Sequence, residues 1–197
     1  MQFALLCTRN LLAVMLSILA VPTASATYVI DIQQVGSNVV ATGSGSIATT
    51  ALTSLGNLSA QSTINAQEAQ IYLGPTGITA DTRYGGVTGP TTLGTINANN
   101  YASSGSGPAV GLLGNIQDIF LPVGYVSDTP VGTSTDTFDN QSLSSMGLTV
   151  GTYTYTWGIG PTADNLIVNI SVPEPTSLSL LALTSLALLR RRQRASA

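Results

Sequence analysis

Histidine and lysine are missing from this chain of 197 residues, and its one cysteine is Cys7. The chain therefore has no imidazole base that works near neutral pH, no Schiff-base amine and no Ser-His-Asp triad. These absences exclude most enzyme classes. Carboxylate chemistry survives, but a glycosidase-like pair needs two carboxyl groups roughly 5 to 9.5 Å apart in a cleft.

Asp136 and Asp139 are the nearest such pair in sequence, and together with Asn140 they could offer oxygen atoms to calcium. The EF-hand loop pattern is absent, however, and acidic residues on a solvated turn explain these side chains adequately. We therefore predict no catalytic residue, no metal site and no cofactor, and we expect that the protein is not an enzyme.

Positive charge is almost absent from the middle of the chain. Of six basic residues, Arg9 lies near the N-terminus and four arginines lie in the last eight residues, which leaves Arg83 alone between them. Residues 27–173 contain eight carboxylates and carry a net charge of −7. Because binding to nucleic acid takes several Lys or Arg contacts with phosphates, nucleic acid is excluded as a partner.

The first 26 residues have the order of a secretory signal peptide. Arg9 precedes an apolar run over residues 11–21, and Pro22 and the small-residue site Ala24-Ser25-Ala26 follow it. We predict cleavage after Ala26, with a permanent N-terminal membrane helix as the alternative. Cleavage would remove Cys7, so the mature chain would have neither a disulfide nor a thiolate ligand.

The last 26 residues combine an acidic proline motif, an apolar run and a block of arginines. The motif is Val172-Pro173-Glu174-Pro175, in which the two prolines favour extended backbone. The apolar run covers residues 176–189, and the arginines that end it are Arg190, Arg191, Arg192 and Arg194. Arginines mark the cytoplasmic side of a membrane segment, so everything before residue 176 should face away from the cytoplasm.

The apolar run is short for a membrane helix. It has 14 residues, whereas roughly 20 are needed to span the hydrocarbon core, so that a buried core helix or an interfacial segment competes. Four arginines next to this run would be costly to bury, but their long stems can reach the lipid headgroups and extend the span. We therefore predict a membrane helix over residues 176–189.

This order of three elements resembles the PEP-CTERM sorting signal of bacterial exported proteins, which a membrane protease called exosortase is thought to process near the motif. The resemblance implies that residues 172–175 are the recognition motif and that the arginines of residues 190–197 are the membrane stop. The export machinery and exosortase are the implied partners. The implied location is an intermediate in the inner membrane, followed by the cell surface or the extracellular space.

A second resemblance lies within the body of the chain. It is similar to a segment that recurs among secreted PEP-CTERM proteins of Gram-negative, exopolysaccharide-producing bacteria, and it is carried by Leu121–Ser127, Thr137–Asn140, Met146–Tyr153, Tyr155–Gly158 and Ala163-Asp164. That segment has no assigned catalytic residues, so the resemblance concerns destination rather than activity.

Between the two ends, Ser, Thr, Gly and Asn dominate and helix formers are sparse. Short β-prone stretches separated by turn residues predict an all-β, β-sandwich-like domain of short antiparallel strands over residues 27–171. The first strand should run over Tyr28–Ile32 and turn at Gly36–Asn38 into Val39–Ala41. Further expected segments are an edge strand with loops over 43–58, a strand over 69–73, a long surface excursion over 81–107, and a strand or one helical turn over 115–121.

The second half of the domain shows clearer alternation. Tyr153, Tyr155 and Trp157 alternate with threonines, which predicts a strand with an aromatic inner face. Residues 166–170 repeat the alternation, so the two strands could pair as a terminal hairpin. Asn140 as an N-cap and Gly147 as a stop predict a brief helix before them.

Three functions of different classes fit these observations. The first is an exported surface or matrix structural protein, and the second is a carbohydrate-binding module or adhesin that uses exposed aromatic rings such as Tyr84, Tyr101 or Trp157. The third is a carboxylate-only hydrolase. Exposure of at least two coplanar rings would favour the second, although aromatic stripes usually pack in a core, and a cleft with two carboxylates would be needed for the third.

Overall fold

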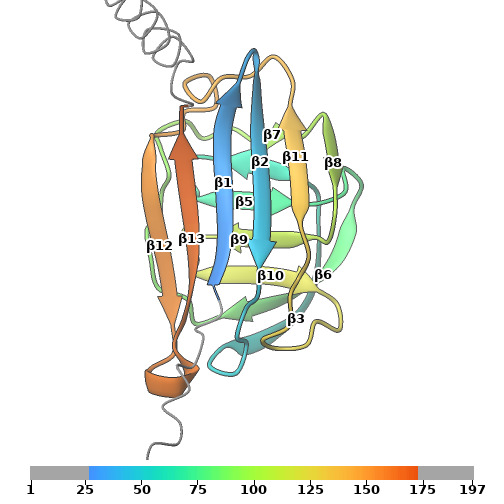
Figure 1. The fold of residues 1–197 in the computed structure, drawn as a ribbon, viewed down its shortest axis with the longest axis vertical. Coiled ribbons are helices and arrows are strands. Elements are labelled where there is room, and N and C mark those ends of the chain that lie inside the picture. Colours follow the sequence, from blue (N-terminus) through green and yellow to red (C-terminus); the bar gives the residue numbers. More distant parts are fainter. Residues whose placement is uncertain (1–26, 173–197) are drawn as a thin grey trace, which may run out of the picture.

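The computed structural model describes residues 27–172 (Figure 1). The predicted signal peptide, including Ala24 and Ala26, the predicted membrane helix and the arginine block lie outside the described residues. Within the described part of the chain, no helix has the length and hydropathy that crossing a membrane requires.

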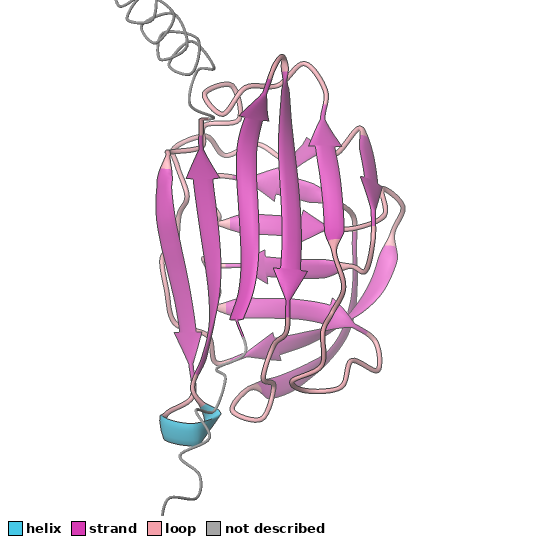
Figure 2. Ribbon diagram, in the orientation of Figure 1, coloured by secondary structure: helices cyan, strands magenta, loops and turns pink. Residues whose placement is uncertain are grey.

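Residues 27–172 form thirteen strands in two sheets, as the all-β prediction requires (Figure 2). The six-stranded sheet contains β1 (Thr27–Val35), β2 (Asn38–Gly45), β8 (Ser104–Ser106), β11 (Ser134–Phe138), β12 (Gly151–Trp157) and β13 (Asp164–Ser171), in the order β12-β13-β1-β2-β11-β8. The seven-stranded sheet contains β3 (Thr53–Ala60), β4 (Thr63–Asn65), β5 (Gln70–Leu73), β6 (Thr79–Gly85), β7 (Asn100–Tyr101), β9 (Val110–Leu113) and β10 (Asp118–Pro122), in the order β3-β6-β10-β9-β5-β4-β7. The strands of one sheet run across those of the other (Figure 1).

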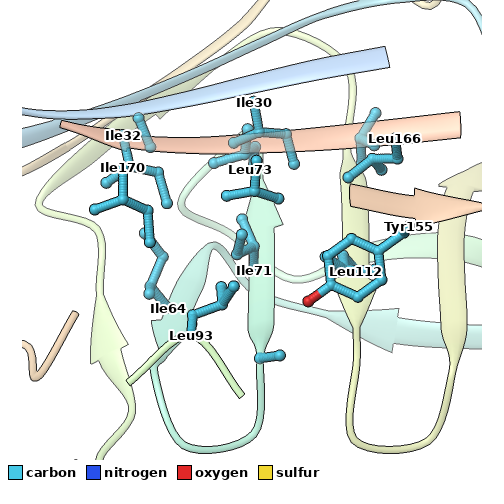
Figure 3. Packing of buried hydrophobic residues seen from close by; sticks show 14 of the residues in the cluster. Ile30, Ile32, Ile64, Ile71, Leu73, Leu93, Leu112, Tyr155, Leu166 and Ile170 are labelled. Carbon is cyan, nitrogen blue, oxygen red and sulfur yellow. The ribbon is translucent and has the colours of Figure 1, made fainter. Parts of the chain in front are cut away.

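The core lies between the two sheets and follows from the period of two in the strands. Successive side chains of a strand point to opposite faces, so every second residue of β1 and β13 turns inward. The inward residues are Tyr28, Ile30 and Ile32 on β1 and Leu166, Val168 and Ile170 on β13, all buried. They meet Ile64, Ile71, Leu73 and Leu112 from the seven-stranded sheet (Figure 3).

Both predicted hairpins are confirmed. β1 and β2 pair antiparallel through a turn in which Gly36 has φ +61°, a conformation that glycine adopts without strain. β12 and β13 pair antiparallel from Gly151↔Ile170 to Trp157↔Asp164, and the 3₁₀-helical turn η1 (Gly160–Thr162) lies between them. The parallel pairing of β1 with β13 was not predicted, because an alternating pattern shows that a strand forms but not which strand it pairs with.

The predicted helix over residues 140–147 is wrong, since this segment consists of turns. The hydroxyl groups of Ser142 and Ser145 cap a single helical turn: each accepts a hydrogen bond from the other residue's N–H at 2.9 Å, and Met146 N donates to the carbonyl oxygen of Ser142 at 3.0 Å. Gly147, with φ +71°, already ends this turn, because Leu148 N donates back to the carbonyl oxygen of Leu143 at 2.8 Å. Asn140 has φ +55° and is not in the extended conformation that is typical of an N-cap.

The predicted surface excursion over residues 81–107 is also wrong in part. Its start belongs to β6, and β7 and β8 lie within it. Leu93, between β6 and β7, is completely buried, and its N–H donates to the carbonyl oxygen of Ala66 at 2.8 Å. The sequence did not indicate this order, because the segment between β6 and β7 is held by isolated backbone hydrogen bonds and by two buried apolar side chains, Val87 and Leu93, which leave no periodic pattern.

The remaining predictions for the seven-stranded sheet agree with the structure. The edge strand expected within residues 43–58 is β3, whose residues are almost all exposed at the edge of the sheet. The strand expected over residues 69–73 is β5. The segment over 115–121 is a turn that leads into β10, so the strand alternative is the correct one.

Candidate functional site at the junction of the domain and its tail

The folded domain ends one residue before the predicted recognition motif. β13 ends at Ser171, and Val172 follows it with 61% of its surface exposed. Pro173, Glu174 and Pro175 lie outside the described residues. A cut within the motif would therefore leave every strand of the domain intact.

The other processing point also lies next to a strand. β1 begins at Thr27, directly after the predicted signal cleavage at Ala26. Because β1 and β13 are parallel neighbours, the start of β1 and the end of β13 lie at opposite ends of the six-stranded sheet (Figure 1). The two predicted processing points are thus separated by the length of the domain.

The two-sheet β-domain ends with β13 at Ser171, and the sequence continues beyond it. Residues 171–194 match the family model of the PEP-CTERM protein-sorting motif, so the chain carries this sorting signal. The match begins at Ser171, one residue before the predicted start of the motif. This motif implies export and processing at the membrane by exosortase.

The family match covers the tail and gives no role to the β-domain. No curated protein and no solved structure matches the chain significantly. The function of the domain must therefore be argued from its own side chains.

Asp136 and Asp139 do not form a carboxylate pair in a cleft. Asp136 lies on β11 and is completely buried, and its carboxylate accepts hydrogen bonds from Ser62 Oγ at 2.5 Å and Gly74 N at 3.2 Å. Asp139 is exposed and accepts from Asn38 Nδ2 at 2.9 Å. Asp136 thus joins the two sheets, because Ser62 and Gly74 flank strands of the seven-stranded sheet.

Two further acidic side chains of the described part, Asp118 and Asp164, also have structural partners. Arg83 Nε donates to Asp118 Oδ2 at 2.6 Å, so the single basic residue of this part is already paired. Asp164 accepts from Ala48 N at 2.6 Å and from Asn165 N at 2.7 Å. Among residues 27–172, no group of three or more His, Cys, Asp or Glu side chains could hold a metal ion.

Burial makes Asp136 sensitive to pH. Loss of solvation raises the pKa of this carboxyl from 3.8 to about 6, although the hydrogen bonds from Ser62 and Gly74 act in the opposite direction. Burial raises the pKa of Asp164 and Asp81 in the same direction. A carboxyl whose pKa is higher in the folded state binds more protons when folded, so folding is favoured as the pH falls.

We predict that the free energy of unfolding decreases as the pH rises from about 4 to about 6, the interval between the two pKa values of Asp136. The expected contribution of Asp136 is about 2 to 3 kcal/mol. Asp136→Asn should flatten this dependence, since the amide cannot ionise but can still bond Ser62 and Gly74. Urea denaturation at stepped pH measures the effect.

Asp139→Asn is the matched control for this prediction, because Asp139 is an exposed carboxylate three positions away. It should keep the slope of the wild type. An Asp136→Asn protein whose stability still falls between pH 4 and pH 6 as steeply as the wild type would contradict the assignment.

The proposed sugar-stacking role of Trp157 is wrong. Only 4% of its surface is exposed, and its Nε1 donates to the carbonyl oxygen of Ala48 at 2.7 Å. Tyr84 is partly buried against the core. Tyr101 on β7 is the exposed ring among the three candidates, with 56% of its surface accessible.

Tyr101 borders a groove that the sequence did not reveal. The groove has a volume of about 440 Å³, and its lining includes Tyr72, Tyr101, Gln61, Gln70, Asn99 and Ile78. None of its lining residues is charged. Its aromatic, amide and aliphatic groups suit a neutral ligand with hydroxyl groups better than a charged one.

Proposed function

We propose that the protein is an exported structural protein of the cell surface or extracellular matrix, sorted by its C-terminal signal and cut by exosortase near Glu174. The observation that carries this proposal is that the sorting motif begins where the last strand ends. A single cut there would release or transfer a complete domain. Such a role needs no catalytic residue, and we propose accordingly that the protein is not an enzyme.

The proposed handling of the chain has three steps. The signal peptide engages the export machinery, and cleavage after Ala26 frees Thr27 to join β1. The apolar run then pauses in the inner membrane with Arg190, Arg191, Arg192 and Arg194 on the cytoplasmic side. Exosortase finally cuts near the motif, which transfers the domain to the surface or the matrix.

The composition of the domain supports a structural role outside the cell. Residues 27–172 contain no cysteine, so their fold does not depend on the redox state of the compartment. Their net negative charge keeps the released domain soluble.

Removal of residues 172–197 tests the proposed destination. The shortened chain keeps all strands, so it should be exported and folded but recovered as a soluble protein, without the surface or matrix fraction that the full chain yields. Quantitative immunoblots of the fractions measure this distribution. An unchanged surface and matrix fraction would contradict the sorting role of the tail.

Carbohydrate binding is a second candidate function, and the uncharged groove beside Tyr101 is the observation that favours it. A sugar could stack on the exposed ring while the amide groups of Gln61, Gln70 and Asn99 bond its hydroxyls. Polysaccharide from the extracellular matrix is the ligand that fits both the groove and the proposed destination.

We predict that Tyr101→Ala weakens binding to the exopolysaccharide of the producing host by about tenfold, which corresponds to about 1.4 kcal/mol. Affinity electrophoresis of the purified protein measures the binding. Val123→Ala removes an exposed apolar side chain that does not line the groove, and it should bind as the wild type does. Equal retardation of both variants and the wild type would rule out the groove as the binding site.

A further inference from the structure

The strand that carries the sorting tail is held on both sides. β13 pairs with β1 in parallel over seven residue pairs, from Thr27↔Asn165 to Gln33↔Ser171. It also pairs with β12 in antiparallel orientation over seven residue pairs. Neither end of β13 therefore extends unpaired beyond its neighbours by more than one residue.

Side chains reinforce this three-strand unit on both faces. On the outer face, Thr152 Oγ1 of β12 donates to Asn169 Oδ1 at 3.0 Å, and Asn169 Nδ2 donates to Asp31 Oδ1 of β1 at 2.9 Å. On the inner face, Leu166, Val168 and Ile170 of β13 are buried in the core. The polar side of β13 is thus linked across the sheet, and its apolar side is fixed by packing.

The direction of β13 determines how it responds to a pull on the tail. A force on Val172 that is opposed at the far end of the domain acts along the strand. The hydrogen bonds to β1 and β12 run across that direction, so many of them must break together before β13 can slide. A force opposed at the same end, for example at Ser37 in the turn after β1, would instead separate the residue pairs one after another.

We propose that β13 is a load-bearing anchor strand, which transmits force from the C-terminal attachment to the body of the domain in shear. Its biological load rests on the proposed function, because it requires the C-terminal end to be attached to a surface or polymer. The mechanical property itself belongs to the fold of residues 27–172. This property would make the domain resist unfolding when force acts along β13, the direction in which the C-terminal attachment pulls.

Single-molecule force spectroscopy of the full chain tests this proposal. Cys7→Ser removes the one native thiol. Two introduced cysteines can then serve as the attachment points, or handles, through which the force is applied. Thr27→Cys with Val172→Cys applies the force along β13, and Ser37→Cys with Val172→Cys applies it across the end of the sheet. Unfolding forces are governed by the barrier along the pulling direction, and we expect the first pair to require at least about twofold more force.

The two proteins have the same fold and differ only in whether the first introduced cysteine is at position 27 or 37, so they form a matched comparison. Asn169→Ala in the first pair should lower the unfolding force, because it removes the bonds to Thr152 and Asp31, while Thr154→Ala on the exposed face of β12 should leave it unchanged. Urea denaturation of each variant separates mechanical from thermodynamic effects.

Equal unfolding forces for the two handle pairs would overturn the proposal. This readout uses neither export nor exosortase. It can therefore fail while the sorting function holds, and sorting can fail while the anchor strand remains mechanically strong.

Discussion

Replacing Glu174 and Pro175 together by alanine should trap the full-length chain in the membrane. The carboxylate and the proline-fixed backbone are the distinctive chemistry of the motif, and a protease site built around a charged group discriminates strongly against a chain that lacks it. Because the altered residues follow the end of β13, the domain should still fold. We expect the processed form to decrease at least about tenfold.

Immunoblots of membrane and extracellular fractions from the native host measure this effect, with intact mass distinguishing the uncut from the cut chain. The control is the double substitution Thr176→Ala with Ser177→Ala, which changes the next two residues and leaves the motif intact. It should be processed like the wild type. Unchanged processing of the Glu174 and Pro175 variant would refute recognition of the motif.

Replacing Trp157 by alanine should destabilise the domain by about 3 to 5 kcal/mol, as expected when a large buried aromatic side chain is removed. The indole packs in the core, and its Nε1 bonds the carbonyl oxygen of Ala48. The N–H of the same residue is bound by Asp164. Trp157 and Asp164 therefore hold residue 48 from both sides, and loss of the ring would also leave a buried carbonyl oxygen without its donor.

Urea denaturation of the purified protein measures this loss, and Tyr101→Ala is the matched control. Tyr101 is an aromatic residue with an exposed ring, so its replacement should change the free energy of unfolding by less than about 0.5 kcal/mol. Trp157→Ala should thus lower the stability of the domain, whereas Tyr101→Ala should weaken ligand binding and leave the stability almost unchanged. A Trp157→Ala protein as stable as the wild type would contradict the core assignment.

The parts of the fold that were predictable are those with a clear period of two. Tyr28, Ile30 and Ile32 recur at every second position, as do Leu166, Val168 and Ile170 of β13, and both hairpins follow from these patterns and their turns. The parallel contact between β1 and β13 was not predictable, because it joins residues more than 130 positions apart (Asn165 pairs with Thr27) and no local pattern specifies it.

The errors have equally local causes. The segment from Asn140 to Gly147 contains the residue types of a capped helix, but the capping serines and the glycine stop lie so close together that only one helical turn fits between them. The burial of Asp136 had a detectable signal, since Asp136 and Phe138 lie on the same face of one strand. The polar character of aspartate concealed it, because carboxylates are rarely buried without partners.

The candidate site was predictable for a different reason. The tail is a linear signal, and the order of its three elements can be read without any fold. The structure adds where the domain ends relative to that signal. The groove beside Tyr101 could not be predicted, because its lining comes from residues that are scattered along the chain and meet only in the folded sheet.

The most direct test of the account is the intact mass of the protein in membrane and extracellular fractions of its native host. The account predicts an extracellular species that begins at Thr27 and ends near Pro173. A species that retains residues 190–197 and remains in the membrane would contradict processing at the motif, and would make the protein a permanently tail-anchored one.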